Sequence, residues 1–341
     1  MVTVKLYKDL RGSQIEQLAA FLQSRKDLIL PYQTIRFSNV IDEVFRYPNL
    51  SLIAFDAGGG VCGFLPQWKK GRVIESVPWR DKGGPVFTSA DSLNALRSET
   101  INLARQTGAS GILWRDFDDP EMVKQTYFVN VDVHLDKHNP ASYLKALNFK
   151  VRGKVNQAKK KNLKFKVTEN PDQKSIRTFY EMFSQNRHRL GVPVYSISLF
   201  VSYFKHLSKD EIKLCEVLSD SDEVLSSLIL IHNGKVAIDG YSGSSAEGLN
   251  LRANDYMIFN VMKYCMENRI GKLDFGADSP LQESLISYKT KWLGDSRSIT
   301  SSVWGTVKEM DHNKEIYNAA RAFFRALPPR LYRIASALVI R

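Results

Sequence analysis

The most constraining feature of this 341-residue sequence is that one order of secondary-structure elements occurs twice. In each half, the spacing of apolar residues predicts a strand, two helices, three strands, a helix and a last strand. In the first half these are 2–7, 13–25, 34–46, 51–56, 61–69, 72–78, 92–106 and 111–115. In the second half they are 163–168, 174–189, 198–207, 212–218, 224–231, 235–241, 254–268 and 272–276. Because residue identity between the halves is negligible, the pattern indicates a duplicated architecture; chance agreement of two α/β stretches is the alternative.

The composition is that of an ordinary globular protein. Hydrophobic residues make up 43% and charged residues 25%, and the length suits two domains. No apolar run approaches the ~20 residues that cross a bilayer, and the N-terminus reads as a strand, so we expect a cytoplasmic protein. The three cysteines are far apart, which argues against a disulfide framework or zinc site. We therefore expect no metal and no permanently bound cofactor.

Positive charge is concentrated in the segment that joins the halves. The formal net charge is +12. Residues 141–161 place apolar side chains at helical spacing, which predicts a linker helix with one buried face. No acidic residue interrupts the basic side chains that follow: Lys145, Lys150, Arg152, Lys154, Lys159, Lys160, Lys161, Lys164 and Lys166. Such crowding of like charge favours a phosphate-bearing ligand, with Arg152 and Lys154 as the candidate contacts. A solvated basic face is the alternative.

Common catalytic signatures do not occur. The sequence contains no Walker motif, nucleophile elbow, zinc-protease motif or Rossmann fingerprint. The nearest match to the acetyl-CoA pyrophosphate signature of GNAT proteins, residues 105–110, follows a helix and ends in Ser. The sequence therefore gives no support to donor binding of the simple GNAT kind.

Several short motifs together resemble the FemABX-related proteins. These are the peptidoglycan bridge aminoacyltransferases and their GNAT-fold relatives in cell-envelope and exopolysaccharide clusters. The resemblance covers about residues 40–305 and rests on the run VPWRDKGGPVF, the basic run 154–159, Arg189–Pro193, the DFG run 274–276 and the run Lys289–Trp292. Two departures are Ala277, where many relatives have Arg, and the additional residue Leu293.

This resemblance implies an α/β (α+β) fold with two tandem GNAT-like acyltransferase domains, each a mixed, mostly antiparallel sheet flanked by helices. We expect these domains at 1–140 and 141–307, the second opening with the basic linker helix 141–161, and a C-terminal helix 308–341 packed on the first. The implied reaction is N-acyl transfer. The donor would be aminoacyl-tRNA or acyl-CoA as co-substrate, and the acceptor an amine on a sugar-linked or lipid-linked envelope precursor, such as one of peptidoglycan or polysaccharide.

The resemblance also suggests two catalytic residues. Lys289 matches a lysine that lies near the reacting ester in the bridge enzymes, where a cation would stabilise the negative charge of the transition state. A surface lysine is the alternative. Asp274 has two interpretations. Either it hydrogen-bonds backbone at a strand end, or it orients or deprotonates the acceptor amine.

Further binding residues are expected around these two. Tyr241 and Ser242 end a central strand, where a GNAT-type sheet splays open. Asp81 and Lys82 lie in a loop that the resemblance places near the acceptor groove. Arg189 is a further candidate, although a basic residue here also suits the C-terminus of a helix.

Two other functions remain open. The basic segment also suits a non-catalytic tRNA- or nucleic-acid-binding protein, although Phe149 and Phe165 are its only aromatics. Residues 313–341 suit an interfacial helix interrupted at Pro328-Pro329, because they mix apolar residues with arginines. Those residues are Phe323, Phe324, Leu331, Leu338, Arg321, Arg325, Arg330 and Arg333. Peripheral contact with the inner membrane face is compatible with an enzyme, and packing on the first domain explains the segment equally well.

Overall fold

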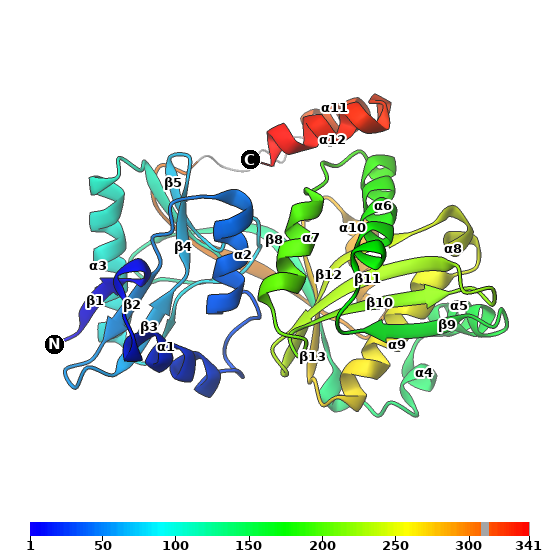
Figure 1. The fold of residues 1–341 in the computed structure, drawn as a ribbon, viewed down its shortest axis with the longest axis horizontal. Helices are drawn as coiled ribbons and strands as arrows, with labels where there is room; N and C mark the ends of the chain where they lie inside the picture. The colour runs from blue at the N-terminus through cyan, green and yellow to red at the C-terminus, as the bar shows by residue number, and fades with distance from the viewer. Residues whose placement is uncertain (308–313, 341) are drawn as a thin grey trace. The chain divides into compact units, whose positions relative to one another are not determined.

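The computed structural model describes residues 1–307 and 314–340 and divides the chain into two units. The first unit contains residues 1–128 and 298–310, and the second contains residues 129–297 and 311–341. Figure 1 follows the elements of both in chain order. Among the described residues, no helix combines the length and apolar character needed to cross a membrane.

The first unit contains the elements predicted for the first half of the chain, with one predicted strand divided into two. Its elements are β1 (Thr3–Leu6), α1 (Ser13–Ser24), α2 (Ile35–Phe45), β2 (Leu52–Phe55), β3 (Val61–Leu65), β4 (Gln67–Lys70), β5 (Val73–Ser76), β6 (Val86–Phe87), α3 (Ala90–Gln106), β7 (Gly111–Trp114) and most of β14 (Asp295–Gly305). The predicted strand 61–69 is divided into β3 and β4 at Pro66, since proline has no N–H to donate within a sheet.

The second unit contains the strands of the second half and the terminal helices. Its strands are the end of β8 (Val123–His134), β9 (Lys164–Thr168), β10 (Ile212–Leu218), β11 (Val224–His232), β12 (Val236–Ser244) and β13 (Lys272–Asp278). Its helices are α4 (Tyr143–Ala146), α5 (Phe149–Lys159), α6 (Gln173–Leu190), α7 (Ile197–His206), α8 (Ala246–Asn250), α9 (Ala253–Glu267), α10 (Glu283–Thr290), α11 (Lys314–Ala326) and α12 (Pro329–Val339). Helices α5 and α9 cover one face of the sheet and enclose the main core.

The duplication is confirmed by the strand order. In the second unit the order is β9-β10-β11-β12-β13, and in the first it is β1-β2-β3 followed by β4-β5-β7. Both halves have one parallel pair at the equivalent place, β5 with β7 and β12 with β13, while their other pairs are antiparallel. The predicted fold class, two tandem GNAT-like domains with mostly antiparallel sheets, is confirmed.

Each sheet receives its last strand from the other half of the sequence. Strand β13 pairs with β8, which follows the first half in the chain, at the register Asp274↔Asp132. Strand β7 pairs with β14, which follows the second half, at the register Ser302↔Trp114. The chain therefore divides after residue 128 and again after residue 297, whereas the sequence predicts boundaries after residues 140 and 307.

The linker segment forms two helices where the sequence predicts one. Leu147 has an extended backbone between α4 and α5, and the Asn148 side chain caps α5 by accepting the Val151 N–H at 3.0 Å. The predicted apolar face is present, because Leu147, Val151, Val155 and Ala158 are buried and α5 packs on α9.

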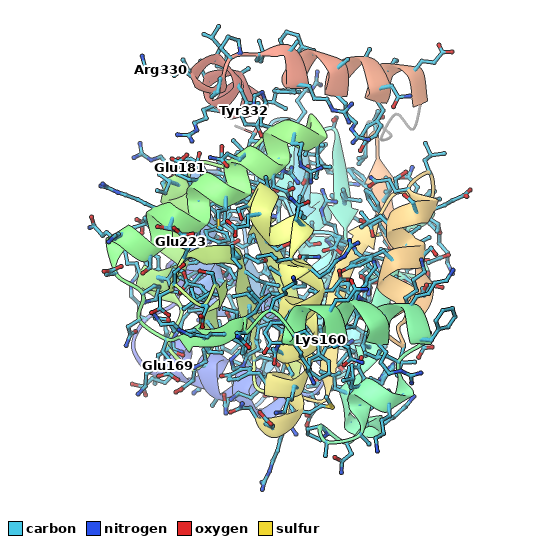
Figure 2. The ribbon with its side chains drawn as sticks, turned by 90° about the vertical axis from the view of Figure 1, so that its right-hand side faces the viewer. Lys160, Glu169, Glu181, Glu223, Arg330 and Tyr332 are labelled. Carbon is cyan, nitrogen blue, oxygen red and sulfur yellow. The ribbon has the colours of Figure 1, made fainter. Side chains whose placement is uncertain are left out.

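The C-terminal helices α11 and α12 contact α6 of the second unit. Tyr332 donates its hydroxyl to Val192 O at 2.7 Å and stacks on His188 with ring centroids 4.4 Å apart. Arg333 pairs with Glu181, and Figure 2 shows Tyr332 directed toward α6. The sequence predicts this segment on the first domain instead. The difference arises because Arg321 and Arg325 donate to a carbonyl oxygen at the C-terminus of α6, a contact that no local pattern indicates. Residues 308–313 and 341 of the predicted helix lie outside the described residues.

Candidate functional site

The two central strands of the second sheet separate at one point. Strands β12 and β13 pair in parallel from Val236↔Lys272 to Ile238↔Asp274, and no pairing is recorded beyond that register. Both strands are irregular just past it. The register of β12 shifts at Gly240, between Asp239 and Tyr241, and the register of β13 shifts between Asp274 and Ala277. The side chains that follow Ile238 and Leu273 therefore border the opening between these strands.

The DFG run forms the irregularity in β13. Gly276 has φ 72°, a left-handed conformation that glycine adopts without steric cost. Asp274 stabilises the turn, because its Oδ1 accepts the Gly276 N–H at 2.8 Å. The turn directs two consecutive carbonyl groups toward one side chain, since Phe275 O and Gly276 O both accept hydrogen bonds from Lys289 Nζ, at 2.7 and 3.0 Å.

Lys289 is a buried cation that binds two carbonyl oxygens and forms one ion pair. It lies in the last turn of α10, and its ion-pair partner is Asp278, whose Oδ2 lies 2.5 Å from Lys289 Nζ. An ammonium group has three N–H donors, and two of them bind Phe275 O and Gly276 O. The structure thus brings the predicted pair Lys289 and Asp274 to the same turn. It also adds Asp278, which the sequence analysis does not single out.

Asp239 is a second acidic group that sequence reasoning missed. The protein around its carboxyl group removes most of the hydration, although part of the residue is exposed, and this raises its pKa to about 6. The Lys289 cation acts in the opposite direction and lowers that pKa, while Asp274 and Asp278 raise it. The one sequence feature that could have indicated Asp239 is that it precedes Gly240 and follows three apolar residues of the strand. Such a group titrates near neutral pH and is suited to accept a proton.

Helix α5 of the basic linker is connected to helix α10, which carries Lys289, by contacts with α9. Lys154 Nζ lies 3.7 Å from Asp255 Oδ1 in the first turn of α9, and burial raises the pKa of Asp255. The neighbouring Asn254 donates to the Tyr288 hydroxyl at 3.0 Å, and Tyr288 directly precedes Lys289 in α10. Polar contacts therefore connect α5, α9 and α10.

The other predicted binding residues of the second unit contact groups other than Lys289 and Asp274. Arg152 donates to Lys145 O at 3.1 Å, and Arg189 donates to Asn186 Oδ1 at 2.8 Å. Tyr241 lies among aromatic side chains of α6 and α7, and its hydroxyl is 3.1 Å from that of Tyr203. Ser242 pairs in register with Leu228.

Asp81 and Lys82 lie in the first unit. The buried Lys82 Nζ is 3.5 Å from Asp81 Oδ2. Among residues 1–307 and 314–340, no cluster of three His, Cys, Asp or Glu side chains is arranged to hold a metal ion.

The first unit has different chemistry at the equivalent place. There β5 and β7 pair in parallel up to Glu75↔Leu113, so an apolar side chain occupies the position of Asp274. Beyond that register Ser76 Oγ accepts the Arg115 N–H at 2.8 Å, and Arg115 pairs with Glu75 at 2.8 Å. The cluster of one lysine and three aspartates therefore belongs to the second repeat.

The comparisons with known proteins agree with this assignment. Residues 149–289 match the family model of the acetyltransferase (GNAT) domain, a range that runs from α5 to Lys289. No curated protein matches the chain at the threshold of the comparison.

Solved structures with this fold span nearly the whole chain. A structure of FemX covers 94% of this chain and 100% of its own length, with a TM-score of 0.67 and 15% identity. A C-terminal domain (DUF2156) from Agrobacterium fabrum, described as that of a lysylphosphatidylglycerol synthetase, gives a TM-score of 0.55 at 14% identity over 90% of this chain and 96% of its own. A tandem GNAT protein from the clavulanic acid biosynthesis pathway gives 0.53 at 10% identity over 91% and 100%. The expected resemblance to FemABX-related GNAT-fold proteins is confirmed.

Proposed function

We propose that this GNAT-fold chain, whose residues 149–289 match the acetyltransferase (GNAT) domain model, transfers an aminoacyl group from aminoacyl-tRNA, or an acyl group from acyl-CoA, to an amine of a cell-envelope precursor. The acceptor would be linked to a sugar, as in peptidoglycan or polysaccharide, or to a lipid. Likeness to FemX supports the first and likeness to the lysylphosphatidylglycerol synthetase domain supports the second.

The observation that carries this proposal is that Lys289, at the turn of β13, lies close enough to the acid Asp239 of β12 to lower its pKa. Acyl transfer to an amine needs a group that removes a proton from nitrogen and a positive charge near the carbonyl oxygen. Asp239, whose pKa is raised to about 6, supplies the first, and Lys289 supplies the second. Asp274 supports both, since it holds the turn that binds Lys289.

In the proposed reaction the acceptor nitrogen attacks the donor carbonyl carbon and a C–N bond forms. The bond from that carbon to the ribose oxygen of tRNA, or to the sulfur of CoA, breaks. Asp239 accepts the proton lost by nitrogen and returns it, directly or through water, to the leaving oxygen or sulfur, so that the carboxylate is restored. Lys289 stabilises the oxyanion by its charge. Direct donation to that oxygen would use the N–H that does not bind Phe275 O or Gly276 O, while Asp278 stays close as the ion-pair partner.

The basic segment provides for the phosphates of either donor. Arg152 and Lys154 lie on α5, and Lys154 is held near the first turn of α9 by Asp255. A helix N-terminus carries partial positive charge, which adds to that of the lysine. Arg189, Tyr241, Ser242, Asp81 and Lys82 stay proposals as further substrate contacts.

The test is transfer by the purified chain. Aminoacyl-tRNA with labelled amino acids and a set of short acyl-CoAs are each offered with amino sugars, lipid amines or peptidoglycan precursors, and products are detected by mass spectrometry. We expect one donor class to give an amide product that disappears in Lys289→Met, while Lys291→Met, altered at an exposed lysine two residues on, retains it. Tight tRNA binding without any transfer would favour the nucleic-acid-binding alternative.

A further inference from the structure

The C-terminal helices carry an apolar surface that the fold does not cover. Of the 17 large apolar side chains that are exposed among the described residues, seven lie in α11 and α12. They are Ile316, Tyr317, Phe323, Leu331, Ile334, Leu338 and Val339, with exposed fractions from 36% to 70%. We name the five that share one face of their helix, Ile316, Phe323, Leu331, Ile334 and Leu338, the apolar stripe.

The apolar stripe is separate from the face that packs on the second unit. In α12, Leu331, Ile334 and Leu338 are spaced three and four residues apart, so they line one side of the helix. Tyr332 and Ser336, which are buried, lie on another side. Ile316 and Phe323 are likewise two turns apart in α11, whereas Phe324 is buried. Each helix thus has one apolar face for packing and a second one for another contact.

The charge around the stripe indicates the nature of that contact. Residues 314–341 contain Lys314, Arg321, Arg325, Arg330, Arg333 and Arg341 against the single acid Glu315. Arg325 and Arg330 are exposed. Arg321 and Arg325 donate to Leu190 O on the packing side, whereas Arg330 directly precedes Leu331 of the stripe. An exposed apolar stripe on helices of positive net charge suits an anionic lipid surface, where the apolar side chains enter the acyl region and guanidinium groups bind phosphates. Against a second copy of the same helices the arginines would repel one another.

The length of the helices also suits an interfacial position. The helices contain 13 and 11 residues and are interrupted at Pro328-Pro329, so neither approaches the ~20 residues that span a bilayer. Helices of this kind lie in the plane of the headgroups.

We propose that α11 and α12 form a docking surface for an anionic lipid bilayer, with the apolar stripe inserted at the boundary of headgroups and acyl chains. The surface is held on the second unit by Arg321, which donates to Leu190 O at the end of α6, and by Tyr332, which donates to Val192 O just after it. The enzyme's second repeat would then work next to the membrane. This inference goes beyond the proposed function and does not depend on it.

Vesicle flotation of the full-length chain tests the proposal. The vesicles consist of phosphatidylcholine alone or with 30–40% phosphatidylglycerol, that is roughly one lipid in three, as in a strongly anionic membrane. We expect the chain to float with the anionic vesicles and to remain largely unbound with phosphatidylcholine. The variant Phe323→Ser, Leu331→Ser, Leu338→Ser should lose at least about tenfold in binding, because each apolar group removed from the interface costs of the order of 1 kcal/mol or more. Since these side chains are exposed, its melting temperature should stay close to that of the unchanged chain.

A matched control separates this surface from positive charge in general. Lys160→Glu alters an exposed lysine at the end of α5 and should keep vesicle binding, whereas Arg330→Glu, at an exposed arginine of α12, should reduce it (Figure 2). Equal binding of the triple serine variant and the unchanged chain would overturn the proposal. So would a dimer that the serine substitutions dissociate, together with no binding to vesicles, since the stripe would then contact a second copy.

Discussion

The side chain of Lys289 is fixed by the backbone of Gly276, whose carbonyl oxygen accepts its hydrogen bond at 3.0 Å. Helix α10 and the turn in β13 therefore position each other. A substitution in α10 should therefore affect the turn in β13, and a substitution in the turn should affect the position of Lys289.

Lys289→Ala should lower kcat by ~10²–10³, roughly 3–4 kcal/mol, with little change in KM, because a positive charge near the developing oxyanion matters most in the transition state. Lys291→Ala is the matched control, as Lys291 is exposed at the end of the same helix. Steady-state kinetics of both variants provide the measurement. Because Asp278 loses its buried partner, thermal unfolding must also be recorded. A variant that remains folded and changes only KM would contradict the role in catalysis.

Asp239→Asn should change the pH dependence of the rate. For the unchanged chain, kcat/KM should rise with pH and level off above about 6, since the carboxylate form accepts the proton. The asparagine variant should be slow and lack this rise. A pH–rate series with Asp9→Asn, an exposed acid of the first unit, as control provides the measurement. An unchanged profile in Asp239→Asn would remove Asp239 from the mechanism.

The same residue should affect stability. The pKa of Asp239 in the folded chain lies above its usual value of 3.8, so the folded chain holds the proton more tightly than the unfolded chain. The free energy of unfolding should therefore decrease as the pH rises from about 4 to about 6, by at most about 3 kcal/mol, and by less because the residue is partly exposed. Urea unfolding across this pH range should show a smaller decrease for Asp239→Asn.

Gly276→Ala should destabilise the protein by about 1–2 kcal/mol, since φ 72° is unfavourable for any residue with a Cβ. It should also reduce activity, because the turn holds Lys289. Gly153→Ala is a contrasting control. Its added methyl group meets no atom within 4 Å, and alanine favours the helix α5, so stability should stay the same or rise by about 0.5–1 kcal/mol. Equal stability of the two variants would show that the turn tolerates a side chain.

Arg152→Ala and Lys154→Ala should weaken binding of the phosphate-bearing donor, and the difference from the unchanged chain should shrink at high salt, where exposed charges are screened within ~10 Å at 0.1 M. Lys137→Ala, at an exposed lysine outside the basic segment, should have little effect. The measurement is donor affinity across a salt series, which distinguishes phosphate binding by the basic segment from a solvated basic face. Affinity that is independent of salt in all of these proteins would mean that the segment is merely a solvated face.

Local sequence patterns predicted most helices and strands. The features that they did not predict depend on contacts between residues far apart in the sequence. The duplicated order and the buried face of residues 147–158 follow from periodicity alone. The strand break at Pro66 and the helix break at Leu147 depend on single residues within patterns that otherwise continue. The pairing of β13 with β8 joins segments more than 130 residues apart, which no local pattern encodes. Asp239 was missed because its significance lies in its neighbours Lys289, Asp274 and Asp278, which come from other elements.

The exchange of last strands between the halves has a consequence for how the chain must acquire its structure. When the first 128 residues have been synthesised, β7 still has an unpaired edge, because its partner β14 lies almost 200 residues further along the chain. Likewise, β8 is synthesised before its partner β13, so this pairing cannot form until β13 has been synthesised. Unpaired strand edges invite aggregation, and pairings between distant segments form slowly. The two halves therefore cannot mature one after the other as independent domains, and a gene cut between them would leave each product with an open sheet.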